Sequence, residues 1–172
     1  MSNGEEFTLI VDVQASLIAE RQEFLPLYVA FLNKGQQRIE LARENFILET
    51  SDGTRLPLVA YREFNTKYPR HRVDLRIGRN FFEAINGRYP SPPFRKRDIE
   101  FYPINESGDV PREMISLAQG ELGLGFVYFR LPSDDLLDDV GTARLLFKPA
   151  GPGADGQQYV VDIQTYSLKT KR

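Results

Sequence analysis

The sequence predicts an all-β domain, an antiparallel sandwich or barrel, and three observations lead to this prediction. Short runs rich in Val, Ile, Phe and Tyr recur along the chain between clusters of Gly, Asp, Asn and Pro. These runs are spaced by roughly 8–14 residues, with no helical segment between most of them. Helical periodicity over three turns is absent, apart from a segment near residues 16–24.

Composition sets limits on the class of protein. The 172 residues fit one domain, residues 1–172, with a sizeable core. The formal net charge of −2 argues against attraction of the whole chain to nucleic acid or anionic lipid, so any such attraction must be local. No apolar run of about 18 residues exists, so no transmembrane segment is expected. The absence of cysteine excludes disulfides, thiolate catalysis and Cys-based zinc sites.

The first half of the chain contains five predicted strands. Asp52-Gly53 is the strongest turn signal, because this dipeptide adopts the positive φ values of a type I′ hairpin turn. Asn33-Lys34-Gly35 predicts a second hairpin, between the second and third strands. The five strands cover residues 7–13, 24–32, 38–41, 45–50 and 55–61.

The second half contains five more, and two strands of the chain share an unusual pattern. Residues 24–32 and 125–131 are apolar at both odd and even positions, whereas a sheet with one solvated face should alternate. A second cover is therefore required, and it is either a helix of this chain or another molecule. The candidate apolar interface consists of Tyr28, Phe126, Tyr128, Phe81 and Phe82. The predicted strands of this half cover residues 98–104, 114–117, 125–131, 143–147 and 158–168.

A basic insertion, residues 62–97, separates the two halves. Its part from residue 67 to residue 97 holds nine Lys or Arg against Asp74 and Glu83, whereas the other 141 residues carry 13 basic and 22 acidic side chains. Three prolines near its end favour an extended return to the next strand.

One short helix is expected inside this insertion. Asn80 and Glu83 have the spacing of a capping box, and Gly87 suits a helix end. About six helical residues would then place Phe81 and Ile85 on one face. A helix this short must dock, and we expect it on the apolar face described above.

The insertion also provides the candidate residues for contact with a ligand or partner. Basic side chains interleaved with aromatic rings are typical of phosphate contact with base stacking, and they would equally suit a phosphorylated glycolipid, an acidic polysaccharide or an acidic protein. The alternative is a solvated cover whose charges pair with the acidic body. The candidates are Arg70, Arg72, Arg76, Arg79, Arg95, Lys96, Arg97, Tyr68, Tyr89 and Phe94.

Catalytic, cofactor and metal signals are weak. His71 is the sole histidine, no Ser or Asp pattern suggests a triad, and it is expected to be an exposed loop residue. Neither the glycines at 123 and 125 nor residues 151–156 form a phosphate-binding loop. We expect no cofactor and no enzymatic activity. A weak calcium candidate is the acidic cluster of Asp134, Asp135, Asp138 and Asp139.

Two stretches carry a resemblance to a known group of domains. Residues 115–132 (ISLAQGELGLGFVYFRLP) and 27–58 (LYVAFLNKGQQRIELARENFILETSDGTRLPL) resemble the strand and turn patterns of bacterial immunoglobulin-like domains of envelope lipoproteins and secreted proteins. The resemblance implies an immunoglobulin-like antiparallel β-sandwich without enzymatic activity. Residues 67–97 depart from the pattern.

The expected function is therefore a non-catalytic binding or assembly module of the bacterial cell envelope. Its partner would be a protein or an acidic envelope polymer, and a lipid anchor would lie outside this sequence. One alternative is a cytoplasmic binder of nucleic acid or another polyanion through residues 67–97, although no nucleic-acid motif accompanies the charge. The other is a carbohydrate-binding domain with exposed Tyr and Phe as platforms.

Overall fold

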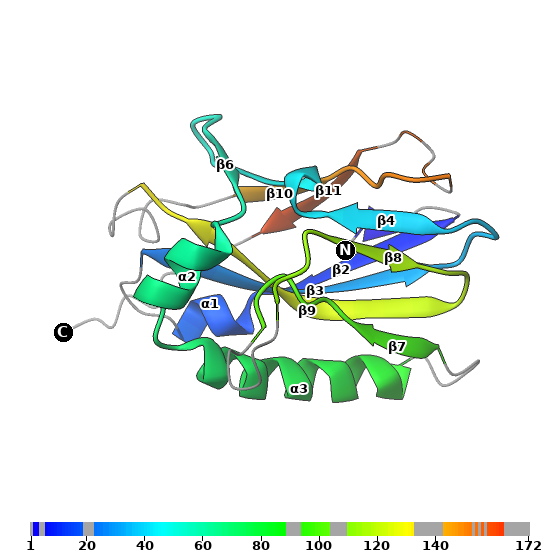
Figure 1. Cartoon of the computed structure of the whole chain (residues 1–172), viewed down its shortest axis with the longest axis horizontal. Helices are drawn as coiled ribbons and strands as arrows, with labels where there is room; N and C mark the ends of the chain where they lie inside the picture. The colour runs from blue at the N-terminus through cyan, green and yellow to red at the C-terminus, as the bar shows by residue number, and fades with distance from the viewer. Residues whose placement is uncertain are drawn as a thin grey trace.

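The computed structural model describes residues 2–3, 6–18, 23–88, 94–103, 110–132, 143–152, 154, 156 and 158–163. This part of the chain is mostly β, with several sheets and few helices, which confirms the β-rich part of the prediction (Figure 1). The central layer is a five-stranded sheet. Its order is β1 (Ser2–Asn3), β2 (Phe7–Asp12), β3 (Phe24–Asn33), β9 (Glu121–Arg130) and β7 (Arg95–Asp98).

The second layer contains the remaining strands. A four-stranded sheet has the order β11 (Tyr159–Ile163), β10 (Ala143–Phe147), β5 (Phe46–Glu49) and β6 (Arg55–Pro57), and β4 (Ile39–Ala42) pairs with β8 (Met114–Leu117). A 3₁₀ turn, η1 (Arg43–Asn45), joins β4 to β5. The β5–β6 hairpin confirms the Asp-Gly turn, with Gly53 at φ +85°. The hairpin predicted near Asn33 is wrong, because β4 pairs with β8 instead of β3.

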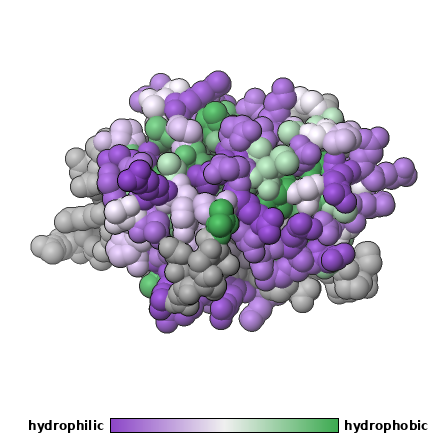
Figure 2. Space-filling view, in the orientation of Figure 1, coloured by the Kyte–Doolittle hydropathy of each residue, from purple (hydrophilic) through white to green (hydrophobic). Residues whose placement is uncertain are grey.

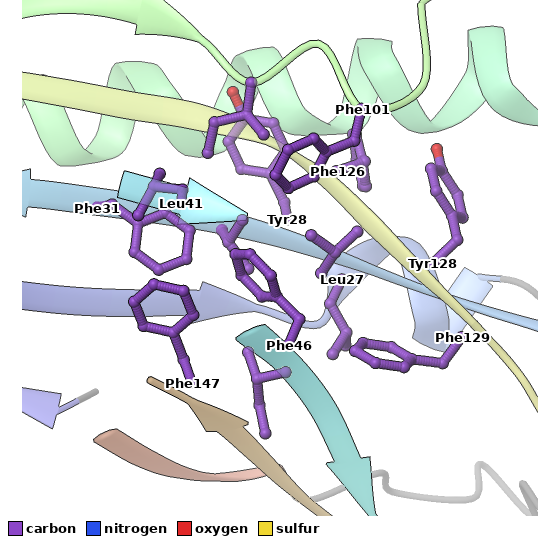
Figure 3. Packing of buried hydrophobic residues seen from close by; sticks show 14 of the residues in the cluster. Leu27, Tyr28, Phe31, Leu41, Phe46, Phe101, Phe126, Tyr128, Phe129 and Phe147 are labelled. Atoms are coloured by element: carbon purple, nitrogen blue, oxygen red, sulfur yellow. The ribbon is translucent and has the colours of Figure 1, made fainter. Parts of the chain in front are cut away.

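The core between the two layers is aromatic. The rings of Phe31, Phe46 and Phe147 form a mutual cluster with centroid distances of 4.7–5.4 Å. Figure 3 shows this cluster, with Leu27 and Phe129 beside it, between β3 and β9 on one side and the second layer on the other. Odd-numbered residues of β3 point into this core, so the even-numbered ones face the opposite side of the sheet.

The helices correct the prediction of one short helix. The chain contains α1 (Gln14–Ile18), α2 (Tyr61–Lys67) and the 18-residue α3 (His71–Arg88), so Asn80 lies inside α3 and not at its start. The reason is that Asp74 and Gly78 occupy buried positions of α3, and neither registers as apolar in a periodicity count. The predicted strand 55–61 likewise ends at Pro57, and α2 follows it.

The edge strand β7 brings two further corrections. It covers residues 95–98 instead of 98–104, and it runs parallel to β9, so the sheet is not wholly antiparallel. The apolar residues of the predicted strand 98–104 that the structure describes are buried, but they follow β7 and are not part of it. Ile99 lies over Gly125, where an added Cβ would meet the Ile99 Cβ at 2.6 Å, and the Phe101 ring lies 5.8 Å from that of Phe46.

The face seen in Figure 2 is largely hydrophilic, with small apolar patches. Among the described residues, the large apolar side chains that are exposed are Leu17, Val110, Met114 and Val160. None of the helices in these ranges combines the length and apolar character needed to span a membrane.

Candidate functional site

The candidate site is organised by α3, which lies on the face of the five-stranded sheet opposite the second layer (Figure 1). The Phe81 ring meets the Tyr28 ring edge-on at 5.6 Å. A Cβ at Gly78 would lie 2.7 Å from Tyr28 Cε2, so glycine is what allows the helix to approach this closely. On the opposite side of the helix, Arg72 and Arg76 are exposed.

This contact covers the apolar face of β3 and β9, for which the sequence predicted a second cover. Tyr28, Phe126 and Tyr128 are at most 8% exposed, and Figure 3 shows them pointing away from the aromatic core toward α3. A helix of the same chain is therefore the cover, and these three residues do not form an open interface. The side chains of Phe82 and Ile85 lie outside the described part of the structure.

A buried carboxylate fixes α3 to the sheet. Asp74 is fully buried, and its Oδ2 accepts hydrogen bonds from the hydroxyls of Tyr68 (2.7 Å) and Tyr128 (3.2 Å). Its Oδ1 is buried without a hydrogen-bond partner among the described atoms. Burial raises the pKa of Asp74, and burial together with the nearby carboxylate raises the pKa of both tyrosines.

His71 begins α3 and is half-buried, so its prediction as an exposed loop residue is wrong. Its ring lies 5.0 Å from that of Phe64 and 5.8 Å from that of Tyr128. Burial lowers the pKa of His71 to about 4, so the ring is neutral at pH 7. It is therefore a hydrogen-bonding group without charge.

A cleft of about 420 Å³ opens between α3, β9 and β7 with the residues that follow β7. We call it the α3–β7 cleft. One wall comes from α3 and the other from β7 and residues 99–103, and side chains of β3 and β9 also contribute. The residues that decide its chemistry are His71, Arg79, Lys96, Asp98, Glu100 and Tyr28.

The charges around the cleft are mostly paired. Lys96 Nζ lies 3.2 Å from Asp98 Oδ1, and Arg112 Nε lies 2.7 Å from Glu100 Oε2. Arg79 has no carboxylate within ion-pair distance in the part of the chain that the structure describes. Burial, and secondarily the charge of Asp98, raises the pKa of Tyr28 to about 12, so its hydroxyl keeps its proton.

A second hollow of about 450 Å³ lies on the other side of β7, toward β8. Here Glu121 is buried, and its Oε1 lies 3.9 Å from Arg95 Nε and 3.8 Å from Arg97 Nη1. These two arginines therefore balance a buried carboxylate of the same chain. For Arg95 and Arg97, the structure therefore agrees with the alternative stated above, in which basic side chains of the insertion pair with acidic side chains of the rest of the chain.

The other candidates from the sequence fall into four groups. Arg72, Arg76 and Arg79 are exposed, whereas Arg70 and Phe94 are half-buried. Tyr68 is buried against Asp74 and cannot stack on a ligand, which corrects its prediction as a contact residue. The residues outside the described ranges are Tyr89, Asp134, Asp135, Asp138 and Asp139.

Sequence reasoning missed Asp74, Asp98 and Glu100. Asp74 carried one usable signal, since an acid three residues after His71 in a helix shares a face with it. Asp98 and Glu100 reach the cleft only because β7 pairs in parallel beside β9. Within the described ranges, no group of three or more His, Cys, Asp or Glu is placed to hold a metal ion.

Comparisons with known proteins give no family. No family model matches the chain, and no curated protein matches it. Among solved structures, the yjhA protein from Bacillus subtilis is similar, with a TM-score of 0.45, 14% identity, and coverage of 92% of this chain and 90% of that one. A "putative lipoprotein", ycdA from Bacillus subtilis, matches with a TM-score of 0.43 and 10% identity over 94% of this chain. This chain covers 35% of ycdA.

Proposed function

We propose that this protein is a non-catalytic binding module with an immunoglobulin-like sandwich, and that it binds an acidic polymer of the bacterial cell envelope through α3. The observation that supports this function is the division of α3 into two faces. The inner face is occupied by its contacts with Tyr28, Phe126 and Tyr128, and the outer face carries Arg72 and Arg76.

The outer face of α3 is suited to a polyanion. Arg72, Arg76 and Arg79 recur at helical spacing and are exposed, while Asp74 is turned inward. Because the helix is held by close packing, these side chains project from a fixed backbone, which reduces the entropy lost on binding. Guanidinium groups also match carboxylate and phosphate oxygens geometrically.

The alternative functions have less support. Within the described ranges no Phe or Tyr is exposed, so the platforms expected for base stacking or for binding neutral sugars are not displayed there. The assignment to the envelope is supported by the resemblance of residues 27–58 and 115–132 to immunoglobulin-like envelope domains.

Binding to polygalacturonate, measured by titration at several salt concentrations, tests the proposal, with neutral dextran as the reference polymer. We expect binding that weakens with salt, because exposed charges are screened. The double variant R72E/R76E should weaken it at least about tenfold, since it replaces two charge-assisted contacts with repulsion.

The matched control is R38E/K148E, which makes the same change in net charge at two exposed positions outside α3. Equal losses in the two variants would show that only net charge matters, and the role of α3 would then be refuted. The absence of binding to polygalacturonate and to polyphosphate at low salt would refute the function as a whole.

A further inference from the structure

The α3–β7 cleft holds polar groups that packing alone does not require. His71, Leu75 and Arg79 line it from one face of α3, since they are spaced four residues apart. Gly125 and Phe126 of β9, and Ile99 after β7, also line the cleft. The volume of about 420 Å³ is within the range of small-molecule sites.

The balance of charge in this cleft favours an anion. Lys96 with Asp98 and Arg112 with Glu100 form two ion pairs of opposite charges, so they leave no excess. Within the described chain, Arg79 is the charged residue of the cleft that lacks such a partner. The carboxylates of the cleft are held in ion pairs, whereas the Arg79 guanidinium is exposed. It can donate two parallel hydrogen bonds to one carboxylate or phosphate group.

Two neutral donors also line the cleft, His71 on α3, about two turns before Arg79, and Tyr28 on β3. The His71 ring is uncharged at pH 7 and carries one N–H, and the Tyr28 hydroxyl remains protonated. Both can donate to an anion without adding charge that would need compensation. Leu75 and Phe126 are apolar residues of the cleft lining, and they are suited to the body that carries the anionic group.

We propose that the α3–β7 cleft binds a small organic anion, with one carboxylate or phosphate group on Arg79 and a sugar-sized body over Leu75 and Phe126. The inference rests on the proposed function in one respect, namely that this anion is a unit of the acidic polymer bound along α3. Arg79 belongs both to the exposed row of arginines and to the wall of the cleft, so it connects the two surfaces.

Amide chemical shifts of the ¹⁵N-labelled protein, recorded during titration with glucuronate, glucose 1-phosphate and neutral glucose, test the assignment. We expect saturable shifts in residues that line the cleft with at least one of the two anions, and a much weaker response to glucose. The two anions separate carboxylate from phosphate recognition. No saturable shift with either anion, or equal binding of glucose, would overturn the proposal.

Two arginines of α3 form a matched pair of variants. R79Q should weaken binding of the anion at least about tenfold, because a charge-assisted hydrogen bond is lost. R76Q makes the same charge change on the same helix but outside the cleft, and it should change the affinity less than about twofold. Equal effects of R79Q and R76Q would contradict a specific cleft.

The variant D98N gives a prediction of opposite sign. Replacing this carboxylate with a neutral amide removes one negative charge from the wall of the cleft, so the affinity for the anion should rise a few-fold. A weaker affinity would contradict the charge balance described above. The outcomes also separate the two proposals, because R72E/R76E tests the polymer surface and leaves the cleft intact. A wild-type protein that binds glucuronate but no acidic polymer would refute the polymer function alone, and a wild-type protein that binds the polymer but neither small anion would refute the cleft alone.

Discussion

The two sides of the five-stranded sheet are covered in different ways. Toward the second layer, an aromatic cluster forms the centre of the core, with Phe31, Phe46 and Phe147 in mutual contact. Toward α3, aromatic rings surround a buried carboxylate, Asp74, and a half-buried histidine, His71. The same strands supply both sides, because β3 and β9 are apolar at odd and even positions alike.

This difference indicates what each cover contributes. Apolar packing is non-directional and supplies most of the free energy of folding. A buried carboxylate must keep its hydrogen-bond partners, so Asp74 specifies where α3 sits along β9 through Tyr68 and Tyr128. The more polar side is the one next to the α3–β7 cleft, where the position of α3 determines where Arg79 projects.

Phe46→Ala should cause the largest loss of stability. Phe46 is fully buried and contacts three other Phe rings, so its truncation should lower the free energy of unfolding by about 3–5 kcal/mol. Urea denaturation measures this loss. Phe81→Ala on the helix side, where the ring is half-buried, should cost about half as much or less. A larger cost for Phe81 would reverse the comparison between the two sides.

The helix side should also make stability depend on pH. The native pKa of His71 is about 4, below its ordinary value of 6.5, so the unfolded chain binds a proton first as the pH falls. Its contribution is complete above pH 6.5 and decreases between about pH 6.5 and pH 4, by up to about 3 kcal/mol. Urea denaturation across this range should show the decrease, and H71Q should remove it.

Asp74 acts in the opposite direction. Its native pKa is raised above 3.8, so the native state keeps the proton longer, and its contribution is lost as the pH rises through the native pKa. In the H71Q background, Asp74 should therefore stabilise the native state as the pH falls through its native pKa, and D74N should remove this contribution. A profile of H71Q that still falls toward acid would show that other groups control the pH dependence.

Gly78→Ala should have the smallest of these effects on stability, although its sign is informative. Alanine in a helix interior ordinarily stabilises by up to about 1 kcal/mol relative to glycine. Here the new Cβ would lie 2.7 Å from Tyr28 Cε2, so we expect a net loss of about 1–2 kcal/mol. Asn80→Ala, at an exposed position two residues later, should be neutral or slightly stabilising. A stabilised Gly78→Ala variant would show that α3 is not closely packed.

Much of the strand content could be predicted from the sequence. The predicted strands 114–117 and 143–147 coincide with β8 and β10, because each run is short and apolar between clear breaks. The need for a second cover over β3 and β9 was also predictable from their apolar pattern. The length of α3 was not, since its buried positions include Asp74 and Gly78, which are unfavourable in a core until Tyr28, Tyr68 and Tyr128 surround them.

The cleft was beyond prediction from the sequence for a related reason. Arg79 lies on α3, whereas Lys96 and Asp98 lie on β7. They line the same cleft only because β7 pairs in parallel with β9. The sequence by itself determined the β-rich class, the turn at Asp52-Gly53 and the excess of positive charge in residues 67–97. Only the tertiary structure decided which of those charges are paired, because ion pairing depends on distances between strands and helices that no local pattern encodes.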